Sequence, residues 1–135
     1  MKTSLLKLFI AVLLALPAMS NAQTPGNPVI YKDWEMIVES LTLIDVSYRS
    51  IKCVSTNQVH LMIFNENSKP QKALFDLEIT DVATGEKFTK EINFDCATAT
   101  VYKALCESET ALDPLKINLP TNFNPSAITV KVTFK

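Results

Sequence analysis

The sequence predicts an all-β protein, built as a single antiparallel sandwich of two sheets with about seven or eight strands. Apolar and polar residues alternate in short runs, which is the pattern of strands with one buried face. Turn-forming residues separate these runs at intervals of roughly ten residues. No window keeps the i, i+3, i+4, i+7 spacing of a helix of ordinary length. Together, these observations favour a sandwich of short strands.

Three segments alternate most clearly: Gln58–Phe64, Ala73–Thr80 and Ala127–Phe134. In the last two, polar neighbours such as Asp76 and Lys131 separate the apolar positions, which indicates a sheet with one face in the core and one in water. Five further strands are predicted from weaker patterns, at Ile30–Val38, Leu41–Cys53, Lys87–Phe94, Thr100–Leu105 and Leu115–Leu119.

The residues between the strands supply the expected turns. Asp81–Gly85 is predicted to be a hairpin turn, because Gly85 can adopt a positive φ. Asn65–Pro70 is predicted to be a polar loop. Within Leu41–Cys53 the alternation changes phase near Leu43, which predicts a β-bulge or a strand that changes sheets.

The first 22 residues have the pattern of a secretory signal peptide. Two lysines precede an apolar run from Leu8 to Leu16, and the small residues Ser20 and Ala22 suit cleavage before Gln23. We therefore expect a secreted or periplasmic protein with a signal peptide (1–22), a flexible leader (23–28) and a β-sandwich domain (29–135). No later run is long and apolar enough to predict a membrane span.

The charge and the glycine content argue against nucleic-acid binding and against a Gly-rich phosphate site. The full sequence has a formal net charge of −1, and the mature chain is more acidic because Lys2 and Lys7 leave with the signal peptide. Nucleic acid is not expected as a partner, since phosphate binding needs a basic stripe. With only two glycines, the chain has no Gly-rich phosphate loop.

Three cysteines, Cys53, Cys96 and Cys106, belong to the predicted domain. Following the direction of successive strands places Cys53 and Cys106 at one end of the sandwich, with Cys96 a strand length of roughly 17–20 Å away. The sequence therefore favours a Cys53–Cys106 disulfide and a free thiol at Cys96, because a disulfide tolerates Cα separations up to only ~7 Å. Pairing of Cys96 with Cys106 is the alternative if 97–105 is a loop, and Cys53–Cys96 or no bridge also stays open. The spare thiol is either a small buried residue or an exposed group able to form a mixed disulfide.

No catalytic, metal or cofactor site is predicted. His60 is the only histidine, and the chain has no strained nucleophile turn for a Ser-His-Asp triad. His60 and Met62 share a strand face, and with Met36 they could in principle bind copper. Periplasmic copper carriers bring several more such ligands, so we prefer a half-buried outer strand face in which methionine fills gaps.

The aromatic residues leave two interpretations open. Tyr31, Trp34 and Phe123 could form a contact patch for a protein or a glycan if they are exposed together. The favoured interpretation makes Trp34 the core aromatic between the two sheets.

The segment lengths and patterning resemble an immunoglobulin-like or fibronectin-III-like domain, and this architectural resemblance implies no functional residues. We expect a monomeric, non-enzymatic binding module whose partner is an unknown protein or glycan, contacted through the loops Asn65–Pro70 and Pro120–Pro125. One alternative is a structural subunit that assembles by strand addition, with Gln23–Val29 as donor strand. Another is a small periplasmic ligand or copper carrier.

Overall fold

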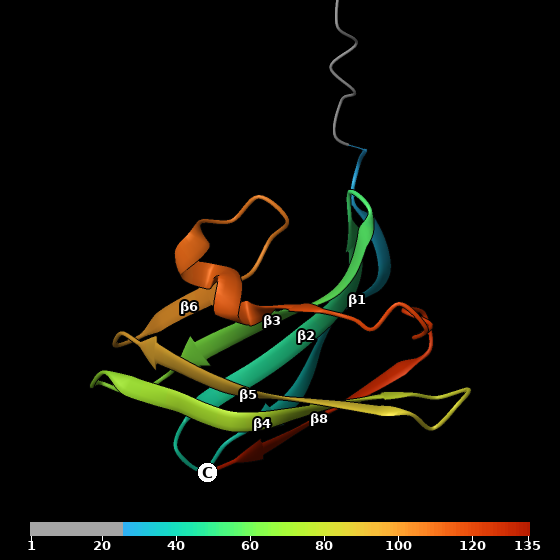
Figure 1. Ribbon diagram of the computed structural model, residues 1–135. Helices are drawn as coiled ribbons and strands as arrows, with labels where there is room; N and C mark the ends of the chain where they lie inside the picture. Colours follow the sequence, from blue (N-terminus) through green and yellow to red (C-terminus); the bar gives the residue numbers. More distant parts are fainter. Residues whose placement is uncertain (1–25) are drawn as a thin grey trace, which may run out of the picture.

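The computed structural model describes residues 26–135 and has the all-β, two-sheet architecture that the sequence predicts. The predicted signal peptide and residues 23–25 of the predicted leader lie outside the described residues. Figure 1 shows the two sheets as separate layers. The larger sheet contains β1 (Val29–Glu39), β2 (Ile44–Cys53), β3 (Thr56–Asn65), β6 (Thr100–Lys103) and β7 (Lys116–Asn118). The smaller sheet contains β4 (Gln71–Asp81), β5 (Lys87–Cys96) and β8 (Ile128–Phe134), and a 3₁₀ helix, η1 (Thr110–Leu115), precedes β7.

All strand pairs are antiparallel, as expected for a sandwich built from hairpins. In the larger sheet the order is β1-β2-β3-β6, and β7 pairs with β3 beyond the short β6. In the smaller sheet β4 lies between β5 and β8. Each predicted strand segment therefore corresponds to an observed strand, with bounds that differ by a few residues.

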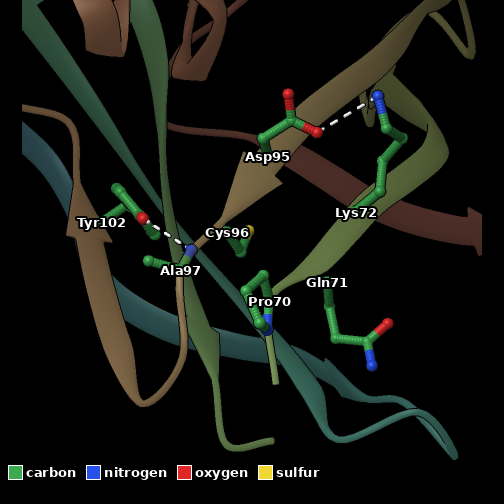
Figure 2. A pocket seen from close by; sticks show the side chains of 7 residues that line it. All are labelled: Pro70, Gln71, Lys72, Asp95, Cys96, Ala97 and Tyr102. Atoms are coloured by element: carbon green, nitrogen blue, oxygen red, sulfur yellow. Dashed lines mark hydrogen bonds and ion pairs between the residues drawn. The ribbon is translucent and has the colours of Figure 1, made fainter.

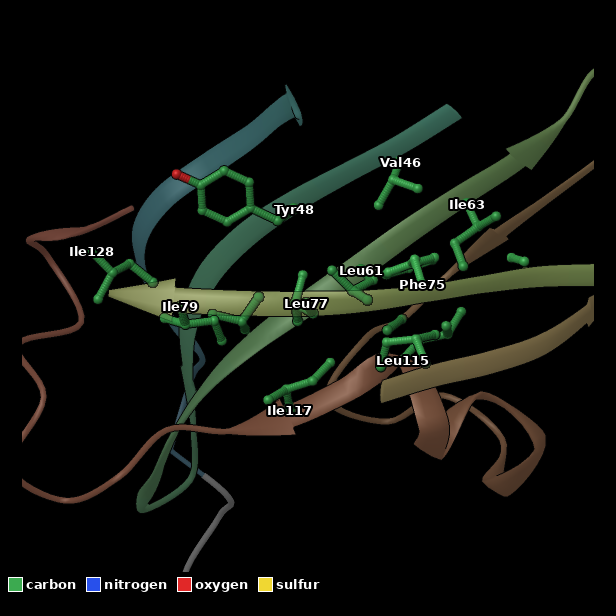
Figure 3. Close-up of a cluster of buried hydrophobic side chains, with 14 of the residues drawn as sticks. Val46, Tyr48, Leu61, Ile63, Phe75, Leu77, Ile79, Leu115, Ile117 and Ile128 are labelled. Atoms are coloured by element: carbon green, nitrogen blue, oxygen red, sulfur yellow. The ribbon is translucent and has the colours of Figure 1, made fainter. Parts of the chain in front are cut away.

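The core lies between the two sheets and is filled by alternate residues of the central strands. Leu61 on β3 and Phe75 and Leu77 on β4 have no exposed surface, and Leu115 at the end of η1 joins them (Figure 3). Burying each side chain of this size stabilises the fold by about 1.5–3 kcal/mol. The period-two pattern of the sequence is therefore the pattern of the core.

We expected a β-bulge or a change of sheet near Leu43, but this segment is the turn that connects β1 to β2. The Leu43 N–H donates to the Ser40 carbonyl at 3.0 Å, and Leu43 has a φ of 58°. The chain reverses here in a tight turn, and β1 and β2 form a hairpin. Leu41 is fully exposed on this turn. The phase change in the sequence arises because Leu41 and Leu43 belong to the turn and not to a strand.

The bulges of this sheet lie in β1 instead. The 11 residues of β1 lie opposite the eight residues Asp45–Lys52, and the pairing register shifts three times along them. One shift places Asp33 and Trp34 together opposite Arg49, and the Asp33 carboxylate accepts the N–H of Trp34 at 2.8 Å. A bulge of this kind redirects the side chains that follow it.

Asp81 stabilises the predicted hairpin turn between β4 and β5. One carboxylate oxygen of Asp81 accepts the N–H groups of Ala83 and Thr84 at 2.9 Å each, and Gly85 has the expected positive φ of 73°. The other oxygen accepts the Asn124 N–H at 2.6 Å. These hydrogen bonds hold the pKa of Asp81 below its ordinary value, and the bond from Asn124 has the largest effect. Asp81 thus connects this turn to the Pro120–Pro125 loop.

The Pro120–Pro125 loop is held against the body of the protein. The Phe123 side chain is only 5% exposed and joins the core. The Ser50 hydroxyl on β2 donates to the carbonyl of Pro125 at 2.7 Å. The loop therefore closes the sandwich and does not extend from it.

A disulfide joins Cys53 at the end of β2 to Cys106 after β6, with a Cα–Cα distance of 5.5 Å. Cys96, at the end of β5, is a free and buried thiol. This is the pairing that strand direction favours. It ties the segment that follows β6 to the larger sheet.

Candidate functional site

The outer faces of the two sheets differ in chemistry. On the smaller sheet the outward side chains form ion pairs across strands, joining Lys72 to Asp95 at 3.1 Å and Lys87 to Glu78 at 2.9 Å. Exposed pairs of this kind contribute little to stability and keep a surface solvated. The outer face of the smaller sheet is therefore an ordinary wet face.

The outer face of the larger sheet carries apolar side chains where a wet face would carry polar ones. Met36 is 58% exposed and Val101 is 53% exposed. Together with Met62 and Phe64 on β3, these two residues line a shallow hollow of about 160 Å³. Phe64 and Val101 are register partners, so they share this face. Exposed apolar groups that gather in this way mark interaction sites.

Trp34 lies on this same face, and two cations lie over its ring. The guanidinium carbon of Arg49 lies 4.9 Å from the centre of the indole ring, and the ammonium of Lys103 lies 5.2 Å from it. Both distances are within the range of cation–π attraction. The interpretation of Trp34 as the aromatic between the sheets is wrong, because the bulge at Asp33 and Trp34 places the indole over Arg49.

His60 links Arg49 to a chain of hydrogen bonds. Arg49 Nη2 lies 3.3 Å from His60 Nδ1, and His60 Nε2 lies 2.8 Å from Gln58 Oε1. A guanidinium only donates, so Nδ1 accepts and the imidazole proton is on Nε2, where it is donated to Gln58. The Gln58 amide in turn donates to Asn118 Oδ1 at 2.8 Å. His60 is therefore held neutral in a single tautomer.

Burial, together with the charge of Arg49, lowers the pKa of His60 from 6.5 to about 4. We expect the only histidine of the chain to titrate near pH 4 by NMR, with the proton of the neutral ring on Nε2. Between pH 6.5 and about 4 the unfolded chain binds the extra proton and the folded chain does not. The free energy of unfolding should therefore fall as the pH drops through this window and level off below it.

His60→Asn is the matched variant for this titration, because the asparagine amide can accept from Arg49 without titrating. The slope of stability between pH 6.5 and 4 should be smaller in this variant. An NMR pKa near the ordinary histidine value would contradict the buried, neutral state of His60.

Tyr31, Trp34 and Phe123, which the sequence suggested as one contact patch, do not share a surface in the structure. Tyr31 is partly exposed, and its hydroxyl donates to Asn57 Oδ1 at 3.2 Å. Phe123 is in the core and offers no contact surface. Of the three aromatics, Trp34 alone belongs to the apolar face described above.

The side chains considered as metal ligands do not come together as a copper site. Met36 and Met62 line one hollow without His60, whose two ring nitrogens face Arg49 and Gln58. A second group, Cys53, His60 and Cys106, places its ligand atoms within 4.8 Å of one another. Because its sulfurs are joined as a disulfide, no thiolate is present to bind a metal.

Glu39, Asp45 and Glu66 form a third group of this kind, at the turn end of β1 and β2. Repulsion from Asp45, first among several causes, raises the pKa of Glu66. Glu39 and Glu66 are exposed, and exposed acidic groups of this kind are common without a bound ion.

A hollow of about 520 Å³ lies where β4 begins and β5 ends, beside Tyr102 of β6 (Figure 2). Lys72 forms an ion pair with Asp95 in its wall, and the Ala97 N–H donates to the Tyr102 hydroxyl at 2.8 Å. The Cys96 thiol in its wall has a pKa raised by burial, so it stays protonated. This hollow therefore offers neither an ionised thiol nor an unpaired charge.

The fold and the outer face define the protein as an antiparallel β-sandwich with one apolar, cation-bearing sheet face. Comparison with known proteins found no matching family model, no matching curated protein and no matching solved structure. Within residues 26–135, none of the helical structure is long and apolar enough to cross a membrane.

Sequence reasoning missed Arg49 and Lys103, the two cations of this site. A signal for Arg49 was present, because it is the only arginine in a chain that otherwise uses lysine, and it sits in the middle of a predicted strand. Lys103 carried no comparable signal. Its place beside Trp34 depends on the pairing of β6 with β3.

Proposed function

We propose that the protein is an exported, non-enzymatic binding module that contacts its partner through the outer face of the larger sheet. The observation that carries this proposal is the contrast between the two outer faces. One is covered by ion pairs, and the other presents Trp34, Met36 and Val101 beside the cations Arg49 and Lys103. Tryptophan, methionine and arginine are the residues that interfaces favour.

The sheet face is a better recognition surface than the two loops considered from the sequence. The Pro120–Pro125 loop is held by hydrogen bonds to the side chains of Asp81 and Ser50. In the Asn65–Pro70 loop, the buried Asn65 amide donates to the carbonyl of Lys69 at 3.0 Å. Their fixed conformations suit them to closing the ends of the sandwich. A partner protein or glycan would instead lie across β1, β3 and β6.

Two observations support export. The pattern of residues 1–22 is that of a secretory signal peptide. The Cys53–Cys106 disulfide is of the kind that persists in oxidising compartments. We therefore propose a secreted or periplasmic location.

Strand addition through the leader receives less support. Val29, the last residue of the proposed donor strand, already pairs with Lys52 inside the larger sheet. The three register shifts of β1 break the regular hydrogen-bond ladder that an incoming strand would extend.

Two substitutions of matched size test the proposed face. Val101→Glu places a charge on it, and Thr133→Glu places the same charge on an exposed β-branched residue of the smaller sheet. Capture from the envelope or medium of the producing cell should recover one partner with both the native chain and Thr133→Glu. Val101→Glu should weaken its binding roughly tenfold or more. Loss with Thr133→Glu alone would place the binding surface on the other sheet.

A further inference from the structure

A second hollow opens on the outer face of the larger sheet, at the end that carries the disulfide. Its volume is about 450 Å³, within the range of small-ligand sites. Ile30, Ile51 and Leu105 give it apolar walls, and Arg49 is the cation that lines it. Cys106 also lines it, so the disulfide fixes one wall to β2.

The charge of Arg49 has no counter-ion in the described part of the chain. The residue is only 9% exposed, and no carboxylate of residues 26–135 forms an ion pair with it. Its one side-chain hydrogen-bond partner is the neutral His60, and its Nε has none. A buried charge without an opposite charge is costly, so proteins rarely keep one without a role.

Two acids lie in the neighbourhood without neutralising this charge. The Asp33 carboxylate attracts Arg49 electrostatically but lies beyond ion-pair distance. It accepts a hydrogen bond from the backbone N–H of Trp34. Glu107 lines the hollow but is exposed to solvent. On the other side, Lys103 adds a second positive charge next to Trp34. The site therefore attracts an anion.

We propose that this hollow binds a small amphipathic carboxylate, with its head at Arg49 and its apolar chain along Ile30, Ile51 and Leu105. A carboxylate matches the planar donors of a guanidinium. It is also compact enough for the small part of Arg49 that is accessible. The inference rests on the proposed function of this face and names the chemistry of one ligand that the face recognises.

Decanoate is the probe, with decanol as the neutral molecule of equal chain length and acetate as the head without a chain. Trp34 is the only tryptophan and contacts Arg49, so its emission reports on the site while calorimetry gives the affinity. Decanoate should bind the native mature protein with one molecule per chain and shift the emission of Trp34. Decanol and acetate should each bind at least roughly tenfold more weakly, because each lacks one half of the interaction.

Two variants locate the bound carboxylate. Arg49→Gln removes the charge, and Leu105→Glu places an acid on the wall of the hollow while leaving Arg49 intact. Each should weaken decanoate binding roughly tenfold or more. Lys131→Gln, which removes a cation from the outer face of the smaller sheet, should leave the affinity unchanged. Leu105 is 43% exposed, so its variant folds even if loss of Arg49 disturbs the sheet.

Equal binding of decanol and decanoate, or unchanged binding by Leu105→Glu, would overturn the proposal. Absence of decanoate binding would overturn it as well. In these cases the partner-capture experiment still tests the proposed function separately. It measures the effect of Val101→Glu, and Val101 lines the other hollow, beside Met36.

Discussion

Replacing Cys53 with serine is expected to lower the free energy of unfolding by roughly 2–5 kcal/mol. The disulfide connects residues that are 53 positions apart, so the bond restricts a large part of the unfolded chain. The chain-entropy estimate for a loop of this size is about 4 kcal/mol. Cys106→Ser should have the same effect within error, because both variants break one bond.

Urea unfolding at neutral pH measures this effect, and Cys96→Ala is the matched control. Cys96 is buried and unbonded, so its variant loses only a small core side chain and should cost about 1 kcal/mol. Non-reducing peptide mapping should recover a Cys53–Cys106 peptide. A Cys96–Cys106 peptide, or a Cys96→Ala variant as unstable as Cys53→Ser, would contradict the pairing.

Phe75→Ala is expected to cost about 3–5 kcal/mol of stability. Phe75 lies on the central strand of the smaller sheet with no exposed surface, and its ring contacts Phe134 edge to face at 5.4 Å between centroids. Alanine would leave a cavity between two sheets that are each held by their own strand pairing. Chemical unfolding measures the loss directly.

Phe64→Ala removes the same side chain from the outer face of the larger sheet and is the control for Phe75→Ala. Phe64 is half-buried and lines the hollow beside Met36 and Val101. We expect a loss of about 1 kcal/mol or less, because little of the core contacts it. A loss as large as that of Phe75→Ala would mean that this face is part of the core.

The strands could be predicted because one face of each is buried, and burial imposes a period of two on residues such as Leu61, Phe75 and Leu77. The disulfide followed from the same strands, since their directions place Cys53 and Cys106 at one end. Trp34 could not be placed, because the register shifts of β1 are a property of its pairing with β2 and leave no mark in composition. Phe123 was considered for the contact patch only if it was exposed, and the structure buries it, because a loop residue can also fill the core.

The candidate site was less predictable than the fold. Arg49, His60, Trp34 and Lys103 come from four different strands, and no two of them form a motif. Their contacts exist only once β1, β3 and β6 are aligned with β2 in the larger sheet. The uncompensated charge of Arg49 is likewise a property of its surroundings.

Site-specific photo-cross-linking in the producing cell tests the central claim most directly. A photoreactive side chain at Met36 would lie on the outer face of the larger sheet, and one at Thr133 on the exposed face of the smaller sheet. The proposed function predicts a covalent partner adduct from position 36 and none above background from position 133. An adduct from position 133 alone, or equal yields from both positions, would contradict it.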